Sequence, residues 1–404
     1  MSWEMTTIGK HCTVTSSKRF HLSERSNSGV PFYCAKEIIQ KNRGEEITDC
    51  DYISEELYLN IAEKFGVPQE NDLLVTTRGT IGVPYLYRRN DRFYFADGNL
   101  TWIKDFKETL LPQFLYYWFR THEGQKKIDA IAKGTAQKAV PIAGIKTLEI
   151  SLPPVDVQRQ IADILTTYDS LIENNQKQIK LLEEAAQRLY KEWFVDLRFP
   201  GHETTPIVDG IPQGWEVCKF SEIASIMSGG TPKTEVKEYY EGDIPFYTPK
   251  DSDGSFFVFD TITHISEAGL EHCNSQYYPE GTVIITARGT VGKTTILAVP
   301  MAMNQSCYAL KCDELNSPYY LFFSLNKEVD SLKTMANGGV FNTIIVKTFD
   351  SISLTIPTQK VLSAFNAVVS SIMQQIKAKM KQNIHLAEAR DRLLPKLMSG
   401  ELEV

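Results

Sequence analysis

The chain has 404 residues, of which 42% are hydrophobic and 23% are charged, and its formal net charge is −7. This length suits two or three domains, and the apolar content excludes a wholly disordered protein. No apolar run approaches the ~20 residues that a membrane span requires. The first residues, MSWEMTTIGKHC, lack the apolar stretch of a signal peptide, so we expect a cytoplasmic protein.

Cysteine and histidine patterns give no sign of a metal site. The chain has seven cysteines and seven histidines. None of the cysteines forms a C-x-x-C pair, and no H-E-x-x-H motif is present. These patterns argue against a disulfide framework, a zinc ribbon and a zinc protease. The negative net charge argues against a general nucleic-acid coat but leaves room for a local basic surface.

The second half of the chain repeats the first at an offset of about 200 residues, so an internal duplication is predicted. Four blocks recur in the same order: 30–33 (VPFY) as 244–247 (IPFY), 74–82 (LVTTRGTIG) as 284–292 (IITARGTVG), 112–117 (PQFLYY) as 318–323 (PYYLFF), and 150–153 (ISLP) as 354–357 (LTIP). The offset drifts between blocks, as expected when surface loops differ in length.

Each copy ends in a long amphipathic segment with an apolar seam of period 3.5, which predicts coiled-coil helices. The seam of the first helix, expected from about 155 to 193, consists of Ile161, Leu165, Ile172, Asn175, Ile179, Leu182 and Leu189. The seam of the second consists of Phe365, Val369, Ile372, Ile376, Leu386 and Leu393, with Lys379 and Asn383 among them. The polar members are either tolerated at the edge of the seam or fix register and antiparallel pairing. The sequence leaves both interpretations open.

Proline and glycine mark the ends of these helices. Pro153 and Pro357 stand at their starts, and 199–201 (FPG) and Ser399–Gly400 at their ends. Residues 198–214 are dense in Pro and Gly and are predicted to form a linker. The predicted domains are 1–153, a central helix and linker at 154–200, a second globular domain at 201–357, and a C-terminal helix at 358–404. Short β-rich runs such as 282–286, with helices such as 111–121, predict a mixed α/β fold for each globular domain.

The run GTVGKT at 289–294 resembles part of a phosphate-binding P-loop, G-x-x-x-x-G-K-[ST], but Ala287 stands where the first glycine is required. The matching residues of the first copy, 77–84, contain no lysine. We therefore interpret each R-G-T-x-G as a tight turn at a strand end, with its glycines at positive φ. Arg78 and Arg288 either project toward a ligand or pair with a carboxylate.

No catalytic constellation is evident, and neither an [DNS]-P-P-[YFW] tetrapeptide nor a Gly-rich cofactor loop is found, so a non-enzymatic protein is expected. Polar and basic residues in the expected loops are of the types that reach phosphates and base edges. The candidates are Lys36, Arg78, Lys133, Thr135, Gln137 and Lys138 in the first copy, and Ser228, Thr231, Lys233, Lys250, Arg288 and Asn342 in the second. For any single one of them, a solvated loop residue is the favoured interpretation.

Three segments, together with the repeat and the R-G-T-x-G turns, carry a family resemblance: 185–196 (AAQRLYKEWFVD), 392–404 (RLLPKLMSGELEV) and 211–216 (IPQGWE). Over essentially its full length the chain resembles the DNA specificity subunit of type I restriction-modification systems. The helical segments match specifically, and the globular parts match in outline.

The resemblance implies two target-recognition domains, 1–153 and 201–357, each followed by a conserved helix, with the two helices antiparallel and the halves related by a pseudo-twofold axis. It implies a subunit without catalysis or cofactor of its own. The expected partners are double-stranded DNA, two methylation subunits that carry S-adenosylmethionine, and optionally two motor-nuclease restriction subunits.

A duplicated unit on stiff helices fits the same function. A helix of ~58 Å can hold two DNA-reading heads about one turn of duplex, ~34 Å, apart. The target would consist of two different half-sites with an unread spacer. The alternative is a coiled-coil scaffold with two protein-binding heads, which would show no salt-dependent affinity for DNA.

Overall fold

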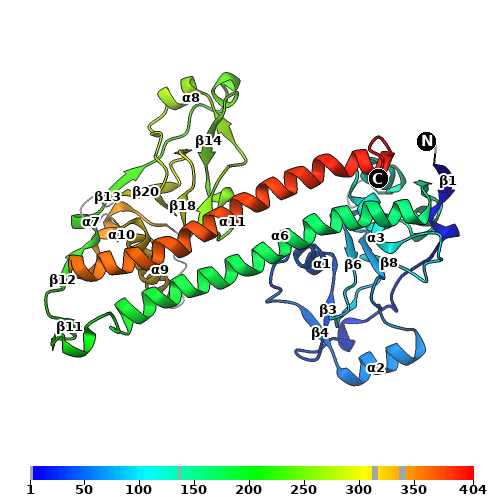
Figure 1. Cartoon of the computed structure of the whole chain (residues 1–404), viewed down its shortest axis with the longest axis horizontal. Coiled ribbons are helices and arrows are strands. Elements are labelled where there is room, and N and C mark those ends of the chain that lie inside the picture. Colours follow the sequence, from blue (N-terminus) through cyan, green and yellow to red (C-terminus); the bar gives the residue numbers. More distant parts are fainter. Residues whose placement is uncertain (1–2, 135–137, 312–316, 336–342) are drawn as a thin grey trace. The chain divides into compact units, whose positions relative to one another are not determined.

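The structure, a computed structural model, describes residues 3–134, 138–311, 317–335 and 343–404 (Figure 1). The chain forms two compact units: unit 1 comprises Met1–Gln176 and Asn383–Val404, and unit 2 comprises Lys177–Gln382. Each unit combines one copy of the repeat with a part of each long helix.

Unit 1 is a mixed α/β structure. Its strands are β1 (Glu4–Thr7), β2 (Thr13–Thr15), β3 (Val30–Tyr33), β4 (Asp51–Ile53), β5 (Leu73–Thr76), β6 (Pro84–Leu86), β7 (Tyr94–Phe95), β8 (Leu100–Lys104) and β9 (Glu149–Leu152). Its shorter helices are α1 (Ala35–Asn42), α2 (Glu55–Lys64), α3 (Pro112–Arg120), α4 (His122–Ile131) and α5 (Ile142–Thr147). The predicted helix at 111–121 is thus confirmed as α3, with Pro112 in its first turn.

Three sheets organise unit 1, in the strand orders β2-β8-β5-β6, β4-β3-β7 and β1-β9. Strand β5 is buried along its whole length, as its continuous apolar run suggests for a central strand. The largest core of the unit joins this sheet to the aromatic face of α3, where Phe114, Leu115 and Trp118 are buried.

Unit 2 contains the strands β10 (Ile207–Val208), β11 (Ile211–Pro212), β12 (Glu216–Lys219), β13 (Ser225–Ser228), β14 (Ile244–Tyr247), β15 (Phe257–Val258), β16 (His264–Ile265), β17 (Val283–Thr286), β18 (Thr294–Leu297), β19 (Ala302–Met303), β20 (Cys307–Lys311) and β21 (Ser353–Ile356). Its shorter helices are α7 (Phe220–Ile223), α8 (Glu267–Glu271), α9 (Pro318–Met335) and α10 (Val346–Asp350). The strand expected at 282–286 is β17.

The sheets of unit 2 repeat those of unit 1. The order β13-β20-β17-β18-β15 matches β2-β8-β5-β6 with one added strand, and β16-β14-β19 matches β4-β3-β7. In both three-stranded sheets the central strand is antiparallel to one neighbour and parallel to the other. The pair β12-β21 matches β1-β9. Because strand order and direction both recur, the predicted duplication extends to the topology.

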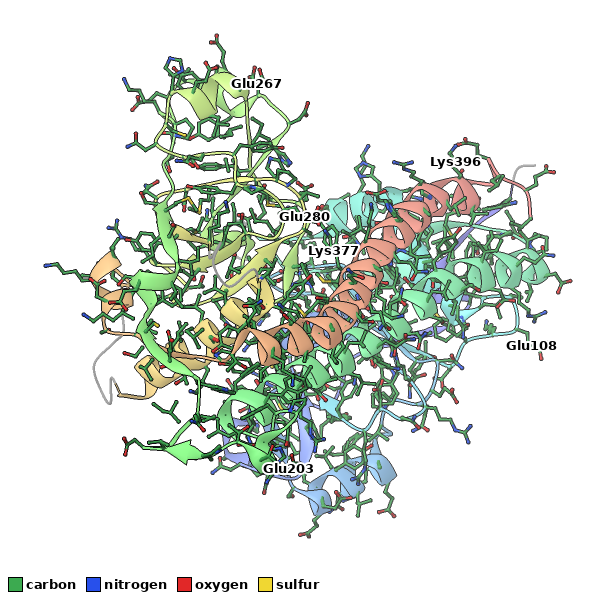
Figure 2. The ribbon with its side chains drawn as sticks, turned by 60° about the vertical axis from the view of Figure 1, so that its left-hand side comes forward. Glu108, Glu203, Glu267, Glu280, Lys377 and Lys396 are labelled. Carbon is green, nitrogen blue, oxygen red and sulfur yellow. The ribbon has the colours of Figure 1, made fainter. Side chains whose placement is uncertain are left out.

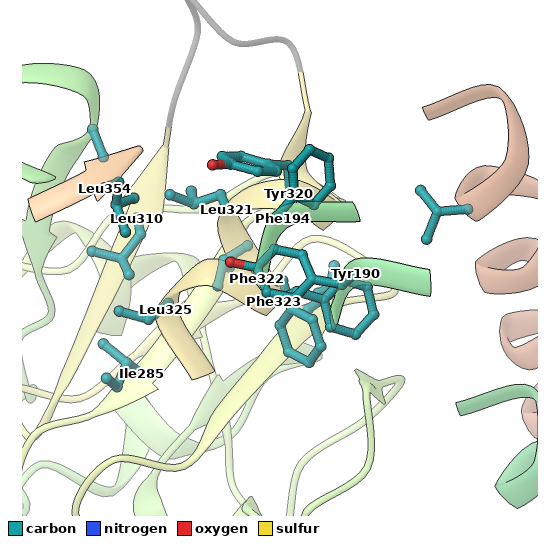
Figure 3. Packing of buried hydrophobic residues seen from close by; sticks show 14 of the residues in the cluster. Tyr190, Phe194, Ile285, Leu310, Tyr320, Leu321, Phe322, Phe323, Leu325 and Leu354 are labelled. Atoms are coloured by element: carbon teal, nitrogen blue, oxygen red, sulfur yellow. The ribbon is translucent and has the colours of Figure 1, made fainter. Parts of the chain in front are cut away.

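The core of unit 2 is rich in aromatic side chains (Figure 3). Tyr190 stacks on Phe323 of α9, with ring centroids 5.7 Å apart, and Phe194 meets the edge of Tyr320 at 4.9 Å. At the surface of the same unit, Lys377 forms an ion pair of 2.5 Å with Glu280 (Figure 2).

The two long helices are α6 (Val155–Tyr190) and α11 (Gln359–Ser399). Both begin just after the predicted prolines, and α11 ends before Gly400 as predicted. Helix α6 continues as a π-helical segment, Lys191–Val195. The region predicted as a plain linker, 198–214, instead contains a 3₁₀ turn (His202–Thr204) and the hairpin β10–β11, because Val208 pairs with Ile211 across a tight turn.

Candidate nucleic-acid interface

In unit 1, loops from both larger sheets meet at one end of the strands. Strand β5 ends at Thr76 opposite Leu100, where β8 begins, and β2 ends beside the same end of β8. The amide of Thr77 donates to the carbonyl of Asn99 at 2.8 Å, and that of Ala96 donates to the carbonyl of Tyr33 at 2.9 Å. We call the loops gathered here recognition edge 1, which comprises the described residues among 16–19, 34–36, 77–83, 97–99 and 133–139.

The R-G-T-I-G turn lies at the centre of recognition edge 1. Gly79 and Gly82 have φ of 76° and 81°, so the predicted left-handed glycines are confirmed. The turn is closed by Thr76, whose carbonyl accepts from Gly82 at 2.7 Å and whose hydroxyl accepts from Val83 at 2.9 Å. Arg78 is exposed, and no carboxylate among the described residues pairs with its guanidinium. The side chain is therefore available to a ligand.

The other basic candidates of unit 1 lie around this turn. The loop that carries Lys133 and Lys138 runs against it, since Ala139 bridges to both Lys133 and Arg78. Lys133 is exposed, whereas Lys138 forms an exposed ion pair with Asp129 at 3.6 Å. Lys36 is exposed in the first turn of α1, three residues after β3 ends. Candidates Thr135 and Gln137 lie outside the described residues.

Unit 2 has an equivalent arrangement, recognition edge 2, which comprises the described residues among 228–233, 248–251, 287–293, 304–306 and 343–344. Gly289 and Gly292 have φ of 79° and 76°. Thr290 of the turn donates its hydroxyl to the carbonyl of Pro249 at 3.2 Å, which brings the exposed Lys250 beside the turn. Arg288 is exposed and, within the described ranges, has no carboxylate partner.

The geometry of this turn differs from that of a P-loop. Residues 287–293 join β17 to the antiparallel strand β18, so Lys293 and Thr294 open a strand rather than a helix. A P-loop wraps phosphate with the N-terminus of a helix. In addition, Ala287 is buried and donates its amide to the carbonyl of Ser306 at 2.7 Å. The turn therefore serves as part of the edge and lacks the geometry of a nucleotide site.

A second loop of recognition edge 2 follows β13. Ser228 is exposed at the strand end, and the backbone then passes so close to β19 that a Cβ at Gly229 would lie 2.3 Å from the carbonyl oxygen of Asn304. This approach places Thr231 against Gln305, to which its hydroxyl donates. Lys233 is exposed two residues later.

Candidate Asn342 lies outside the described residues. The chain that follows it reaches the edge, since the amide of Ile344 donates to the carbonyl of Ala287 at 2.9 Å. In unit 1, Val140 donates to Thr77 in the same way, also at 2.9 Å. In both edges, therefore, a loop from near the C-terminal end of the repeat lies beside the arginine turn.

The sequence interpretation missed Gln305, an exposed amide of recognition edge 2 that accepts from the hydroxyl of Thr231. The available signal was the polar run Asn304–Gln305–Ser306 between two buried strands, β19 and β20. Polar residues at a strand end are the ones that a sheet presents to a ligand.

Burial affects two ionisable side chains near the edges, Tyr33 and Cys307. Burial raises the pKa of Tyr33 to about 12, with Cys50 as the next contribution. Burial also raises the pKa of the Cys307 thiol. Among the described residues, no group of three His, Cys, Asp or Glu is placed to hold a metal ion, and no helix is both long and apolar enough to cross a bilayer. The edges offer cations, hydroxyls and amides, which are groups that reach phosphates and base edges, and also contain the carboxylates of Asp97 and Asp251.

The helix-seam residues face the interior in each unit. Ile161, Leu165 and Asn175 are buried in unit 1, and Phe365, Val369 and Ile376 are buried in unit 2. The remaining predicted members are partly buried, namely Ile172, Ile179, Leu182, Leu189, Ile372, Leu386 and Leu393. The seam is thus on the covered side of both helices.

Comparison with known proteins gives a consistent result. A family model described as "Type I restriction modification DNA specificity domain" matches residues 1–184 and 212–383. The HindI specificity subunit of Haemophilus influenzae is 24% identical over 386 residues, covering 78% of this chain and 84% of the relative. The MjaIX specificity subunit of Methanocaldococcus jannaschii is 29% identical over 312 residues, covering 74% and 71%.

Among solved structures, the S subunit of a type I restriction-modification system from M. genitalium has a similar fold, with a TM-score of 0.61 and 17% identity. The match covers 98% of this chain and 96% of that one.

Proposed function

The chain belongs to the family of type I restriction-modification DNA specificity domains, and on that premise we propose that it reads two different half-sites, one with each recognition edge. Sequence-specific DNA recognition is its function, which leaves the coiled-coil scaffold without support. The observation that carries the proposal is the recurrence, on the same glycine turn of both units, of an exposed arginine with no carboxylate partner among the described residues.

The side chains of the edges suit the major groove of DNA. An arginine can bind guanine O6 and N7 with two hydrogen bonds, and a glutamine can bind adenine N6 and N7. Arg78 and Arg288 supply the first kind of group in each unit, and Gln305, oriented by Thr231, supplies the second in unit 2. Recognition edge 1 has Lys133 instead. Because the two edges differ chemically, the target would be asymmetric.

We propose that the recognition domains and the two long helices position the recognition edges on DNA and bind the partner subunits. The recognition domains would be 1–153 and 201–357, and α6 and α11 would form an antiparallel coiled coil that sets the length of the unread spacer. The relatives are subunits of type I restriction enzymes. By analogy this chain would position two methylation subunits, which carry S-adenosylmethionine, and optionally two restriction subunits. It would itself be non-catalytic and would act in the cytoplasm, where DNA is accessible to it.

The test maps methylated adenines in cells that express the chain with its methylation subunit. Arg288→Ala should weaken or relax one half-site, and Arg78→Ala the other, each by about 1–3 kcal/mol or roughly 10- to 100-fold in affinity. Lys360→Ala removes an exposed cation at the start of α11 that belongs to neither recognition edge, and should change neither half-site. A variant that alters both half-sites together would contradict the assignment of one edge to each.

A further inference from the structure

A partly buried carboxylate, Asp169, joins α11 to α3 and α6 within unit 1. Asp169 of α6 accepts from Arg120 at 2.8 Å, from the hydroxyl of Tyr117 at 2.8 Å and from Arg390 of α11 at 2.6 Å. Burial on its own would raise the pKa of Asp169, but Arg120 and Arg390 outweigh it and lower the pKa below the ordinary value. The carboxylate is therefore held ionised between two cations.

A second polar contact lies further along the same two helices. The side-chain amide of Asn175 donates to the side-chain carbonyl of Asn383 at 2.9 Å, and Asn383 reaches the carbonyl of Ile172 at 3.4 Å. Asn175 is only 6% exposed. Since Asn175 meets Asn383 whereas the earlier Asp169 meets the later Arg390, the helices are antiparallel where they meet in unit 1.

The internal repeat identifies the positions in unit 2 that correspond to these contacts. Pro153 corresponds to Pro357, an offset of 204. With this offset, Ile161 and Leu394, which belong to one core in unit 1, correspond to Phe365 and Tyr190. Those two rings do meet in unit 2, with centroids 6.5 Å apart. The correspondence therefore holds for contacts as well as for sequence.

At the corresponding positions unit 2 has no charged network. Asp169 corresponds to Met373 and Arg390 to Ala186, both fully buried in the apolar core. Arg120 corresponds to Asn326, which borders a cavity of about 390 Å³. The asparagine pair is likewise missing, since Asn175 corresponds to Lys379 and Asn383 to Ile179.

We propose that these contacts form a pairing code, by which the unit 1 face of α6 accepts α11 and rejects a second copy of α6. If two copies of the first half paired with each other, Ala186 would replace Arg390 beside Asp169, and Ile179 would face Asn175. If two copies of the second half paired, Arg390 would be buried against Met373 without a carboxylate. The first pairing removes the contacts that Asn175 and the partly buried Asp169 make with α11, and the second removes the contact of Arg390 with Asp169. Loss of such polar contacts at a helix interface is the usual basis of helix-partner selection.

The pairing code can be tested on the full-length protein after a single proteolytic cleavage. A protease site inserted at the exposed turn Asp209–Gly210 of the hairpin β10–β11 would divide the chain into 1–209 and 210–404 after folding. The nicked protein is dissociated in denaturant, refolded at equal amounts of each piece, and weighed by native mass spectrometry. Pairs that contain one piece of each kind, 1–209 with 210–404, should exceed pairs of two identical pieces by at least about 30-fold. A statistical distribution of pairs would overturn the proposal.

A variant with the unit 2 residues in unit 1 gives the complementary result. Asp169→Met, Arg120→Asn and Arg390→Ala together should raise the share of 1–209 self-pairs at least about tenfold. The control Arg159→Ala removes an exposed ion pair with Asp156 on the same helix and should leave the distribution unchanged. An unchanged distribution in the triple variant would refute the code, and if that variant does not refold, the wild-type distribution alone decides.

Discussion

Glu183 of α6 offers a test of how the helix packs on unit 2. The side chain is partly buried next to the seam residue Leu182. Burial raises the pKa of Glu183 from 4.5 to about 7, the backbone amide of Phe256 opposes this by hydrogen bonding to the carboxylate, and Asp253 adds to it. The folded protein thus keeps this proton over a range in which the unfolded chain has lost it.

The sign of the pH effect follows from proton linkage. Between pH 4.5 and about 7 the folded state binds more protons at Glu183 than the unfolded state, so stability falls as the pH rises and reaches its full loss above about pH 7. The shift corresponds to about 3 kcal/mol for a fully buried group. Because Glu183 is only partly buried, we expect about 1–2 kcal/mol after screening by solvent.

Glu183→Gln removes the ionisation and keeps the shape. The variant should be more stable than the wild type by about 1–2 kcal/mol at about pH 8.5, and the gain should disappear at about pH 5. Urea unfolding followed by circular dichroism at both pH values measures the difference. The matched control is Glu184→Gln, an exposed neighbour, which should be neutral at both. Equal effects of Glu183→Gln at the two pH values would refute the reasoning.

Three further results are expected. Leu182→Glu should destabilise unit 2 by about 2–4 kcal/mol in the same urea assay, because it places a charge in the seam. The control Leu181→Glu changes a side chain that is 64% exposed and should cost less than about 0.5 kcal/mol. Four residues inserted after Glu184 should lengthen the helix by ~6 Å. The gap between the methylated half-sites should change and the bases of the half-sites should not. Changed half-site bases would contradict the proposal that the helices set the length of the unread spacer. ATP should not be hydrolysed by the purified chain, and turnover that is lost on Lys293→Ala would show that a strand-turn-strand can act as a P-loop.

The duplication and the helices were predictable because both depend on local patterns. The recurrence of VPFY as IPFY marked equivalent segments, which form β3 and β14, and the R-G-T-x-G runs predicted equivalent turns with glycines at positive φ. Apolar spacing, together with proline and glycine at the ends, placed α6 and α11 to within a few residues. In each case the information lies within one turn or one strand of the residue concerned.

The recognition edges were only partly predictable, since they depend on which loops the sheets bring together. Lys250 was a candidate because it follows a repeated strand, but its position beside the turn at 288–292 results from the contact between Thr290 and Pro249, which are far apart in sequence. Gln305 was missed because the polar run 304–306 between two buried strands does not by itself show which side chain faces a ligand. The hairpin β10–β11 was missed because its Pro/Gly content fits a linker equally well.

The polar seam residues show the same limit most clearly. Spacing placed Asn175 and Asn383 on the apolar side of their helices, and left open whether they were tolerated or fixed the register. The hydrogen bond of 2.9 Å between them favours the second interpretation, because a slip of one turn would separate the two amides and set Asn383 against the apolar Leu171 or Ile179. That choice depends on a partner 208 residues away, which no local pattern can identify. The same holds for Asp169, whose two arginines come from α3 and α11. A repeat predicts where two halves are alike, and the differences that would let them recognise each other emerge only from the contacts.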